Sequence, residues 1–338
     1  MTKLKPFSRP ILSVIVISYN TAKMTLQTIN SVLADFDRSV SLRDQAQLVV
    51  VDNDSQDDSV KQLKKIKDSR LNLIKNKKNL GFSQANNLAI KKYPADFYLL
   101  LNSDTIVHSG ALEKLVQTMA QHPVQETTAS LESEQGKLDK LGILAATLLN
   151  SDGTIQPQGG HLPTLTNLFF QMSLLDDLPL LGQLLPSPQQ TGQRFSWLKR
   201  RQYQKRKPFQ QGWVGGTAML IRHSLTEEIG LLDPNIFMYG EDIEYCLRAR
   251  HHHWDIAIDP QAQVTHFGSG SSSSFNALKG ELENYVYIWS KHKPDWQLPL
   301  LKSVLWFGAV LRSFLFGTIL KDNQKAKAYR QAANLIKG

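Results

Sequence analysis

The sequence predicts an α/β protein with a Rossmann-like, mostly parallel central sheet flanked by helices, and three observations support this fold class. The apolar runs 12–18, 47–51 and 97–101 are short and continuous, which is typical of strands covered on both faces of a sheet. Stretches with apolar residues at three- and four-residue intervals lie between these runs. Polar residues follow each run directly. This alternation indicates βαβα units with right-handed crossovers.

The length and composition allow one large core or two modest ones. The chain has 338 residues, of which 41% are hydrophobic and 20% charged, so neither disorder nor a fibre is indicated. We expect a main domain over 1–275 and a C-terminal helical extension over 276–338. A stretch rich in Gln, Glu, Ser and Thr predicts a solvent-exposed insertion at about 123–140.

Periodicity and turn signals define the remaining expected elements. The expected helices are 25–33, 59–66, 83–91, 110–121, 225–229 and 242–250, and the later strands are 213–222, 256–258 and 263–265. The apolar run 11–17 near the N-terminus is β-branched and too short for a signal peptide. It is better explained as part of the first buried strand.

Cysteine content and charge limit the compartment and the partners. Cys246 is the single cysteine, which excludes an internal disulfide and a cysteine-rich zinc site and fits a reducing, cytoplasmic compartment. The formal charge of +9 favours anionic partners such as nucleotide phosphates, anionic lipid or nucleic acid. The sign of the charge does not choose among them.

Polar side chains follow all three early strands, where an open α/β sheet binds its ligands. The segments are Ser-Tyr-Asn at 18–20, Asp-Asn-Asp-Ser at 52–55 and Asn-Ser-Asp at 102–104. Any one of them is also an ordinary strand-ending turn. Their coincidence on successive strands favours a ligand site.

No glycine cradle for phosphate is present. Neither G-x-G-x-x-G nor G-x-x-x-x-G-K-[ST] occurs, which disfavours a dinucleotide-binding Rossmann enzyme and a P-loop enzyme. A bound diphosphate would then need a divalent cation held by carboxylate oxygen. Asp104 is the first candidate ligand.

Two downstream features could complete such a site. Glu241 and Asp242 follow an apolar-aromatic run and a glycine, a setting suited to a general base that takes a proton from a hydroxyl. The alternative is a favourable charge at a helix N-terminus. His266 precedes a Gly-Ser-rich segment and could join Asp104 at a metal, although a single histidine is more often structural.

The chain resembles glycosyltransferase family 2, and within it the rhamnosyltransferase-like branch. The resemblance extends over about 260 residues in order and spacing. The matching motifs are VIVISYN at 14–20, VVVDNDSQDDS at 49–59, NLGFSQANNLAI at 79–90, YLLLNSDTIV at 98–107, SDGTIQPQGG at 151–160, WVGGTAMLIR at 213–222, LLDPNIFMYGEDIEYCLRAR at 231–250 and VTHFGSGSS at 264–272. The resemblance implies the GT-A fold and an inverting transfer of a sugar from a nucleotide-diphosphate donor.

The resemblance also implies roles for individual residues. The donor base and ribose would be lined by Tyr19, Asp52 and Asn53, with a neighbouring wall formed by Gly81, Phe82 and Asn86. The catalytic base would be Asp242, with Glu241 beside it, and the acceptor side would comprise Trp213, Gly215 and Gly216. Asn102, Ser103 and Asp104 stand where many relatives have Asp-x-Asp, so Asp104 and His266 would hold a divalent metal, Mg²⁺ or Mn²⁺.

The expected partners follow from the same resemblance. They are a nucleotide-diphosphate sugar, with dTDP-rhamnose as the family-weighted donor, and a glycan or lipid-linked acceptor used in cell-surface polysaccharide synthesis, with no nucleic acid. The alternatives are a nucleotidyltransferase, or a non-catalytic basic protein that binds nucleic acid or membrane. The Gly-rich, Lys-containing loop that a nucleotidyltransferase has after its first strand is absent from this sequence, which disfavours that alternative. The cationic stretch 199–207 has few interleaved aromatic residues, which disfavours binding of single-stranded nucleic acid.

The apolar stretch 298–320 predicts a helix that lies on a membrane. Lys302 and Arg312 leave no charge-free run near the roughly 20 residues that span a bilayer. On a helical wheel Lys302, Ala309, Arg312, Ser313 and Gly317 share one side, which indicates an imperfect amphipathic helix at the inner face of the plasma membrane. The alternative is a helix packed on the main domain or on the partner in a homodimer.

Overall fold

The computed structural model describes residues 9–124, 138–178, 182, 185–189, 197–268 and 274–337. The chain divides into two compact units. We call residues 1–157, 198–237 and 241–269 the catalytic unit, because the sequence analysis expects the catalytic residues there, and residues 158–197, 238–240 and 270–338 the C-terminal unit. Most of the expected insertion and most of the Gly-Ser-rich segment, at 125–137 and 269–273, lie outside the described residues.

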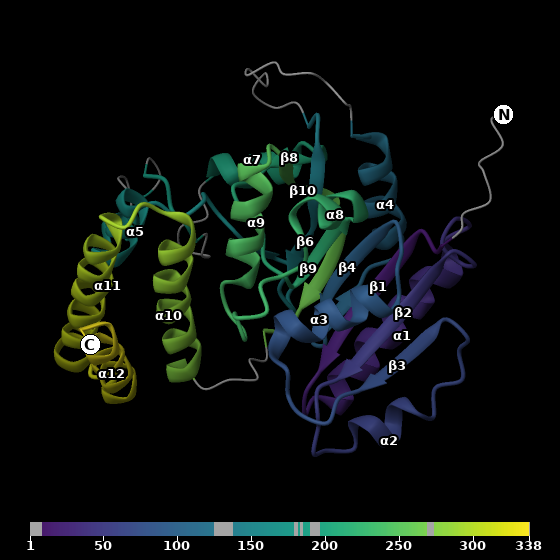
Figure 1. The fold of residues 1–338 in the computed structure, drawn as a ribbon, viewed down its shortest axis with the longest axis horizontal. Helices are drawn as coiled ribbons and strands as arrows, with labels where there is room; N and C mark the ends of the chain where they lie inside the picture. Colours follow the sequence, from purple (N-terminus) through teal and green to yellow (C-terminus); the bar gives the residue numbers. More distant parts are fainter. Residues whose placement is uncertain are drawn as a thin grey trace. The chain divides into compact units, whose positions relative to one another are not determined.

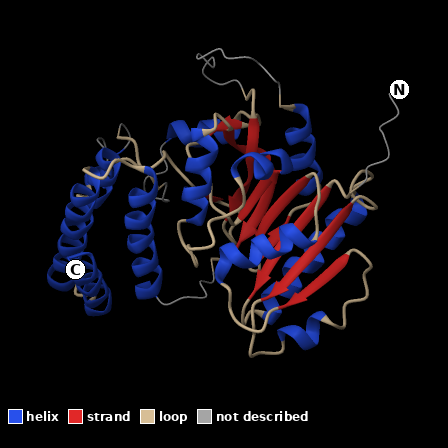
Figure 2. Cartoon of the chain, in the orientation of Figure 1, coloured by secondary structure: helices blue, strands red, loops and turns tan. Residues whose placement is uncertain are grey.

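The catalytic unit is built on one mixed sheet flanked by helices (Figures 1 and 2). Along the sheet the strands follow the order β3-β2-β1-β4-β9-β6-β10-β5, with β7 beside β6 and β8 beside β10. The strands are β1 Leu12–Ser18, β2 Ala46–Asp52, β3 Leu71–Lys75, β4 Phe97–Asn102, β5 Thr105–Val107, β6 Leu141–Leu149, β7 Ile155–Gln156, β8 Phe209–Gln210, β9 Ala218–Arg222 and β10 Asp255–His266.

The first half of the sheet is parallel, as the sequence predicts. β1 pairs in parallel with both β2 and β4, and β2 pairs in parallel with β3. All three predicted strands are therefore confirmed to within one residue at each end. The sequence analysis does not predict β3 or β6, although β6 is buried along its whole length.

The second half is mixed, and here the predicted boundaries are wrong in two places. β9 is antiparallel to β4 and β6 and begins only at Ala218, so 213–217 is not part of the strand. The two predicted strands 256–258 and 263–265 are a single strand, β10, whose pairing with β6 shifts register between Asp259 and Gln263. Pro260 lies in this interval, and it has no N–H to donate to a ladder.

The helices of the catalytic unit cover the sheet. They are α1 Ala22–Arg38, α2 Ser59–Leu63, α3 Gly81–Lys92, α4 Ala111–Gln121, α8 His223–Ile229 and α9 Glu241–His251, and α7 Trp197–Gln204 begins at the unit boundary. Side chains of α1 and α4, such as Ile29 and Leu115, share one buried cluster with Val14 and Val16 of β1. Because strand side chains alternate between faces, Ile15 points to the other face, where α3 packs.

The described part of the C-terminal unit is helical. It contains α5 Leu165–Met172, a 3₁₀ turn Leu175–Asp177, α10 Ser274–His292, α11 Gln297–Phe314, a π-helical turn Leu315–Ile319 and α12 Asn323–Lys337. α11 packs against α5, α10 and α12. The expected extension at 276–338 is therefore helical, and residues 158–197 join the same unit.

Candidate active site

The end of β4 and the start of β9 lie at the same edge of the sheet. Leu101 pairs with Ala218 in the antiparallel register, and the Asn102 N–H donates to the Thr217 carbonyl at 3.0 Å. Asp104 follows this strand end by two residues, and Gly216 directly precedes Thr217. Residues more than a hundred positions apart are therefore brought together by one strand pairing.

Asp242 is fixed at this edge by backbone donors. The Gly216 N–H donates to Asp242 Oδ2 at 3.2 Å, and the Ile243 N–H donates to Oδ1 at 2.8 Å. Burial raises the pKa of Asp242, while these two N–H donors act in the opposite direction. The residue opens α9, so part of its placement is that of an acid in a first helical turn. A carboxyl with a raised pKa and fixed orientation is suited to accept a proton.

Asp104 and His266 form the second feature of this edge. β5 is antiparallel to β10, and its register places His266 opposite Thr105, the residue after Asp104. His266 Nε2 lies 3.4 Å from Asp104 Oδ1, and both side chains are mostly buried. The Phe267 N–H donates to the Asp104 carbonyl at 3.0 Å, which ties the two segments together. The predicted pair is therefore in contact.

The orientation of His266 is set by Gln156, which the sequence analysis does not single out. The Gln156 amide donates from Nε2 to Asn150 Oδ1 at 3.1 Å, so its Oε1 faces His266 Nδ1 at 2.8 Å. An amide oxygen accepts only, so His266 Nδ1 carries the proton. In the neutral ring, Nε2 then presents a lone pair toward Asp104. Two lone-pair donors at this distance suit a shared cation.

The pair fits a divalent metal only as part of a larger set of ligands. Among the described residues no group of three or more His, Cys, Asp and Glu side chains gathers as a metal site. Asp104 and His266 supply one hard oxygen and one imidazole nitrogen. The remaining positions would have to come from donor phosphate oxygens and water, as is usual for Mg²⁺.

Asp52, at the end of β2, has an unused acceptor. Its side chain is fully buried, and Oδ2 accepts from the Ser55 N–H at 3.2 Å. Oδ1 has no hydrogen-bond partner among the described residues. A buried carboxylate oxygen without a donor is costly, so it marks a position where a ligand N–H or O–H would be favourable. Tyr19, at the end of β1, is exposed.

Asn53 holds the neighbouring loop. Its Nδ2 donates to Asn79 Oδ1 and to the Gly81 carbonyl, and its Oδ1 accepts from Asn76 Nδ2 and the Leu80 N–H. These four bonds use the whole capacity of an amide. The side chain therefore shapes the wall at 76–81, and contact between Asn53 and the donor stays a prediction.

Gly81 meets a close approach that only glycine allows. Its φ is +75°, and a Cβ would lie 2.4 Å from the Phe237 carbonyl oxygen. The next residue, Phe82, donates its N–H to the same carbonyl at 2.7 Å. The start of α3 and the segment that precedes α9 are therefore held against each other.

The Phe82 ring connects this wall to the acceptor side. A Cβ on Gly216 would lie 3.1 Å from Phe82 Cε1 and 4.0 Å from Glu241 Oε1, so these three residues meet. Asn86 donates to the Phe82 carbonyl at 2.9 Å, and its Oδ1 has no partner among the described residues. Gly215 lies beside Gly216, whereas the Trp213 side chain is buried. Direct acceptor contact by Trp213 and Gly215 stays a prediction.

Asn87 is a second positioning residue that the sequence analysis does not identify. Its Nδ2 donates to the Leu232 carbonyl at 2.7 Å, and its Oδ1 accepts from the Leu232 N–H at 3.1 Å. The buried ion pair of Glu244 with Arg248, at 2.8 Å, anchors α9 nearby, because Arg248 also donates to the Leu231 carbonyl. The sequence signal for Asn87 was its place in the motif NLGFSQANNLAI. Its partner Leu232 lies 145 positions further along the chain, so the contact could not be read from the motif.

The family model described as Glycosyl transferase family 2 matches residues 13–163. This range carries the ends of β1, β2 and β4, and with them Asp52 and Asp104. Residues 13–163 of the chain belong to glycosyltransferase family 2. It is also 21% identical over 238 residues to an N-acetylglucosaminyl-diphospho-decaprenol L-rhamnosyltransferase of Mycobacterium tuberculosis, covering 66% of this chain and 68% of that protein. In the chain studied here, Asp242 and His266 lie beyond the residues that the family model matches.

Solved structures show the same fold at low identity. GalNAc-T7 with UDP, GalNAc and Mn²⁺ aligns with a TM-score of 0.58 at 15% identity, over 96% of this chain and 55% of that one. The mannosyltransferase PcManGT of Pyrobaculum calidifontis, in complex with GDP-Man and Mn²⁺, aligns with a TM-score of 0.52 at 13% identity, over 98% and 90%. The chain thus has the predicted GT-A fold. The family match supports a glycosyltransferase over the nucleotidyltransferase and non-catalytic alternatives.

Proposed function

We propose that this glycosyltransferase is an inverting, metal-dependent enzyme that moves a sugar from a nucleoside-diphosphate donor to a hydroxyl of a glycan or lipid-linked acceptor. Rhamnose is the first candidate sugar. We place the reaction in cell-surface polysaccharide synthesis, at the cytoplasmic side of the membrane. The proposal rests on one observation: the β4–β9 pairing brings Asn102, two residues before Asp104, to Thr217, which follows the Gly216 that donates to Asp242. A base and a phosphate-binding group at one edge are the two requirements of this reaction.

Asp242 takes the proton in the proposed step. Its carboxylate accepts the proton of the acceptor hydroxyl while the hydroxyl oxygen forms a bond to the anomeric carbon of the donor. The bond between that carbon and the diphosphate oxygen breaks, and the electron pair leaves with the nucleoside diphosphate. A single displacement inverts the configuration at the anomeric carbon. The Gly216 and Ile243 N–H donors keep the carboxylate aimed during this step.

Asp104 and His266 would hold the divalent ion beside the donor diphosphate. A bound divalent cation offsets the charge that develops on the leaving phosphate. Gln156 keeps the His266 ring in the tautomer that presents Nε2 to this position. The role of the chain here is to preorganise these two ligands.

Asp52 supports a donor with a pyrimidine base. Its unpartnered, buried Oδ1 is an acceptor, which matches the ring N–H of thymine or uracil. The Mycobacterium tuberculosis relative is named as an L-rhamnosyltransferase acting on a lipid-linked diphosphate, which supports rhamnose and a lipid-linked acceptor. The two structural neighbours hold Mn²⁺ with UDP and with GDP-Man, which supports a divalent metal and leaves the base open.

A donor panel tests the proposal. The purified full chain is incubated with a lipid-linked glycan acceptor and dTDP-, UDP- or GDP-sugars, with Mn²⁺ or EDTA, and the released nucleotide is identified by chromatography. We expect metal-dependent release of dTDP from dTDP-rhamnose, and NMR of the product should show the anomeric configuration opposite to that of the donor. Retained configuration, or release that EDTA does not reduce, would contradict the mechanism.

A further inference from the structure

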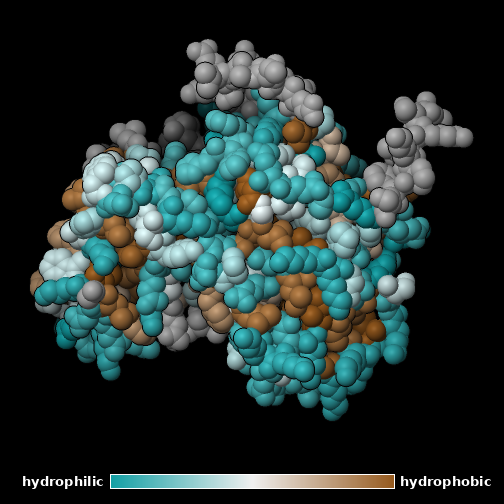
Figure 3. All heavy atoms as spheres, viewed as in Figure 1, coloured by the Kyte–Doolittle hydropathy of each residue, from teal (hydrophilic) through white to brown (hydrophobic). Residues whose placement is uncertain are grey.

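Helix α11 of the C-terminal unit has many of its large apolar residues on the outside, although Leu301 and Leu305 are buried. Eight apolar side chains from Trp296 to Leu320 are 41–65% exposed, which is unusual for residues of this size. Leu300, Phe307, Val310 and Phe314 are spaced by three, four or seven residues and so lie on one side of the helix. We call the eight exposed side chains the outer face; they are Trp296, Leu300, Trp306, Phe307, Val310, Phe314, Ile319 and Leu320. Figure 3 shows hydrophobic residues reaching the surface over α11.

Small residues and a guanidinium occupy the opposite side of α11. Gly308 approaches α5 so closely that a Cβ would lie 2.6 Å from Met172 Cβ, and Ser313 donates to the Ala326 carbonyl of α12 at 3.0 Å. Arg312 donates to the Gln171 and Met172 carbonyls at 2.6 and 2.7 Å, at the C-terminal end of α5. Ala309, Arg312 and Ser313, which share one side of the helical wheel, therefore lie on the side of α11 that packs against the neighbouring helices.

We infer that the outer face of α11 docks on a membrane surface that contains anionic lipid. Residues 296–337 carry seven basic residues and one acidic residue, so the helices that present the outer face are strongly cationic. Lys321, Lys325, Lys327, Arg330 and Lys337 are exposed. Apolar and aromatic side chains next to several cations are the combination that binds the interface of an anionic bilayer.

The neighbouring helices favour docking over spanning. Among the described residues, the stretch Gln297–Ile319 is long and apolar enough to cross a bilayer by length and composition. α12 lies along α11, however, and its exposed cations would have to enter the hydrocarbon with it. A helix packed on one side and apolar on the other is suited to lie in the plane of the interface.

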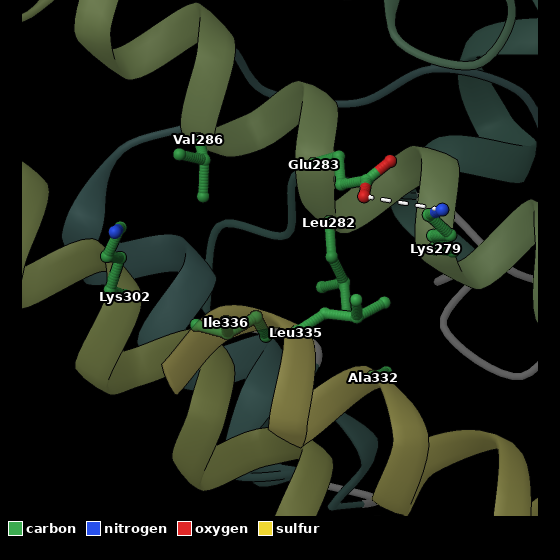
Figure 4. A pocket seen from close by; sticks show the side chains of 8 residues that line it. All are labelled: Lys279, Leu282, Glu283, Val286, Lys302, Ala332, Leu335 and Ile336. Carbon is green, nitrogen blue, oxygen red and sulfur yellow. Dashed lines mark ion pairs between the residues drawn. The ribbon is translucent and has the colours of Figure 1, made fainter. Parts of the chain in front are cut away.

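A groove lies between α10, α11 and α12 in the same unit. Its floor is apolar, with Leu282, Val286 and Ile336, and Lys302 and Lys279 lie at its borders (Figure 4). Lys279 is paired with Glu283 at 3.7 Å, whereas Lys302 stands on α11 one turn before Trp306. A cation beside an apolar groove is compatible with the headgroup and chain of an anionic lipid.

Vesicle flotation tests the docking. Wild-type full-length protein is mixed with phosphatidylcholine vesicles, with or without phosphatidylglycerol, and compared with the double variant Trp306→Gln/Phe314→Gln. We expect wild type to float with the anionic vesicles and the double variant to bind at least about tenfold more weakly, because two aromatic anchors are lost. Val40→Gln is the matched control, since Val40 is an exposed apolar residue of the catalytic unit.

A second variant tests the charge. Lys325→Gln/Lys327→Gln should weaken binding to phosphatidylglycerol vesicles about tenfold and make it less sensitive to salt. Unchanged flotation of the Trp306/Phe314 variant would overturn the inference. So would light scattering that shows a dimer dissociated by this variant while vesicle binding persists, because the outer face would then bind a second copy.

The docking goes beyond the proposed reaction and uses none of its site residues. Turnover with a water-soluble acceptor should therefore stay at the wild-type rate in the Trp306→Gln/Phe314→Gln variant. Loss of vesicle binding with full turnover supports docking alone. Intact vesicle binding with no turnover from any sugar nucleotide counts against the transferase mechanism alone.

Discussion

The catalytic unit keeps most of its large apolar side chains inside, whereas α11 of the C-terminal unit has many of its own outside. Val14, Leu48 and Leu99 are completely buried between helices and sheet, but Phe314 and Trp306 are 59% and 41% exposed. Burial in the first case stabilises the fold by roughly 1.5–3 kcal/mol for each side chain. The exposed side chains of α11 do not gain this burial energy on folding. Their exposure is explained by the inferred contact with a membrane surface.

The same contrast holds for polar groups. In the catalytic unit polar side chains collect at the edge where strands end, and they are held there by backbone donors and amides. In the C-terminal unit the conspicuous inward polar group is Arg312, which satisfies the last carbonyls of α5. Polar groups thus build a site in one unit and terminate a helix in the other.

The largest effect is expected for Asp242→Asn. Loss of the base should lower kcat by about 10²–10⁴-fold, because the acceptor hydroxyl then has no proton acceptor. Donor binding and vesicle binding should be retained. Burial raises the pKa of Asp242 above its unfolded value, so the ionised carboxyl destabilises the fold at neutral pH, and Asn should not lower the Tm. Transfer at the wild-type rate would refute the assignment.

The pH profile should show the same carboxyl. The base must be ionised, so kcat/KM should fall about tenfold for each pH unit below the raised pKa of Asp242. The acidic limb should therefore lie above the value of about 4 that is ordinary for aspartate. Asp242→Glu should move the limb, which identifies the group. A limb at the ordinary value would show that another residue limits the rate.

Gly81→Ala should destabilise the catalytic unit by about 2–4 kcal/mol, because strain at positive φ adds to a clash. The clash is with the Phe237 carbonyl, 2.4 Å from a Cβ. Gly110→Ala is the matched control: its φ is +79° and nothing lies within 4 Å. It should cost about 1–2 kcal/mol, the strain alone. If chemical denaturation shows the same loss of unfolding free energy for Gly81→Ala and Gly110→Ala, the contact between Gly81 and the Phe237 carbonyl is not tight.

Gln156→Leu should weaken Mn²⁺ binding by about 10–100-fold, since an outer-shell partner of a ligand is removed. Gln156→Glu retains an acceptor for His266 Nδ1, so its affinity for Mn²⁺ should fall less than that of Gln156→Leu. Titration calorimetry in the presence of UDP measures both. If wild type binds no Mn²⁺, the metal proposal fails. If Gln156→Leu binds as tightly as wild type, only the positioning role of Gln156 fails.

The smallest effect tests the comparison of the two units most directly. Gly308→Ala should lower the stability of the C-terminal unit by about 1 kcal/mol, because overpacking against Met172 outweighs the better helix propensity of Ala. Trp306→Ala should leave the stability in solution almost unchanged, although it removes far more apolar surface. The reverse order in thermal unfolding would show that α11 packs with Trp306 inward.

The sequence by itself determined three of the four strands in the parallel half of the sheet, β1, β2 and β4, and the candidate site residues. Continuous β-branched runs specify buried strands, and Asp104 and Asp242 stand out because acids next to strand ends and glycines are unusual. These signals are local. β6 escaped prediction because it follows an unusual polar stretch. The boundary of β9 was misplaced because the strand begins only after Gly216, which lies against the Phe82 ring.

Only the tertiary structure decided which residues meet and which face of α11 is outside. The tautomer of His266 depends on Gln156, 110 positions earlier, and the register of β5 with β10 brings the ring to Asp104. A helical wheel shows two faces but not their neighbours, and Gly308 and Arg312 face inward because α5 lies against them. Long-range contacts have no period along the chain, so no local pattern in the sequence encodes them.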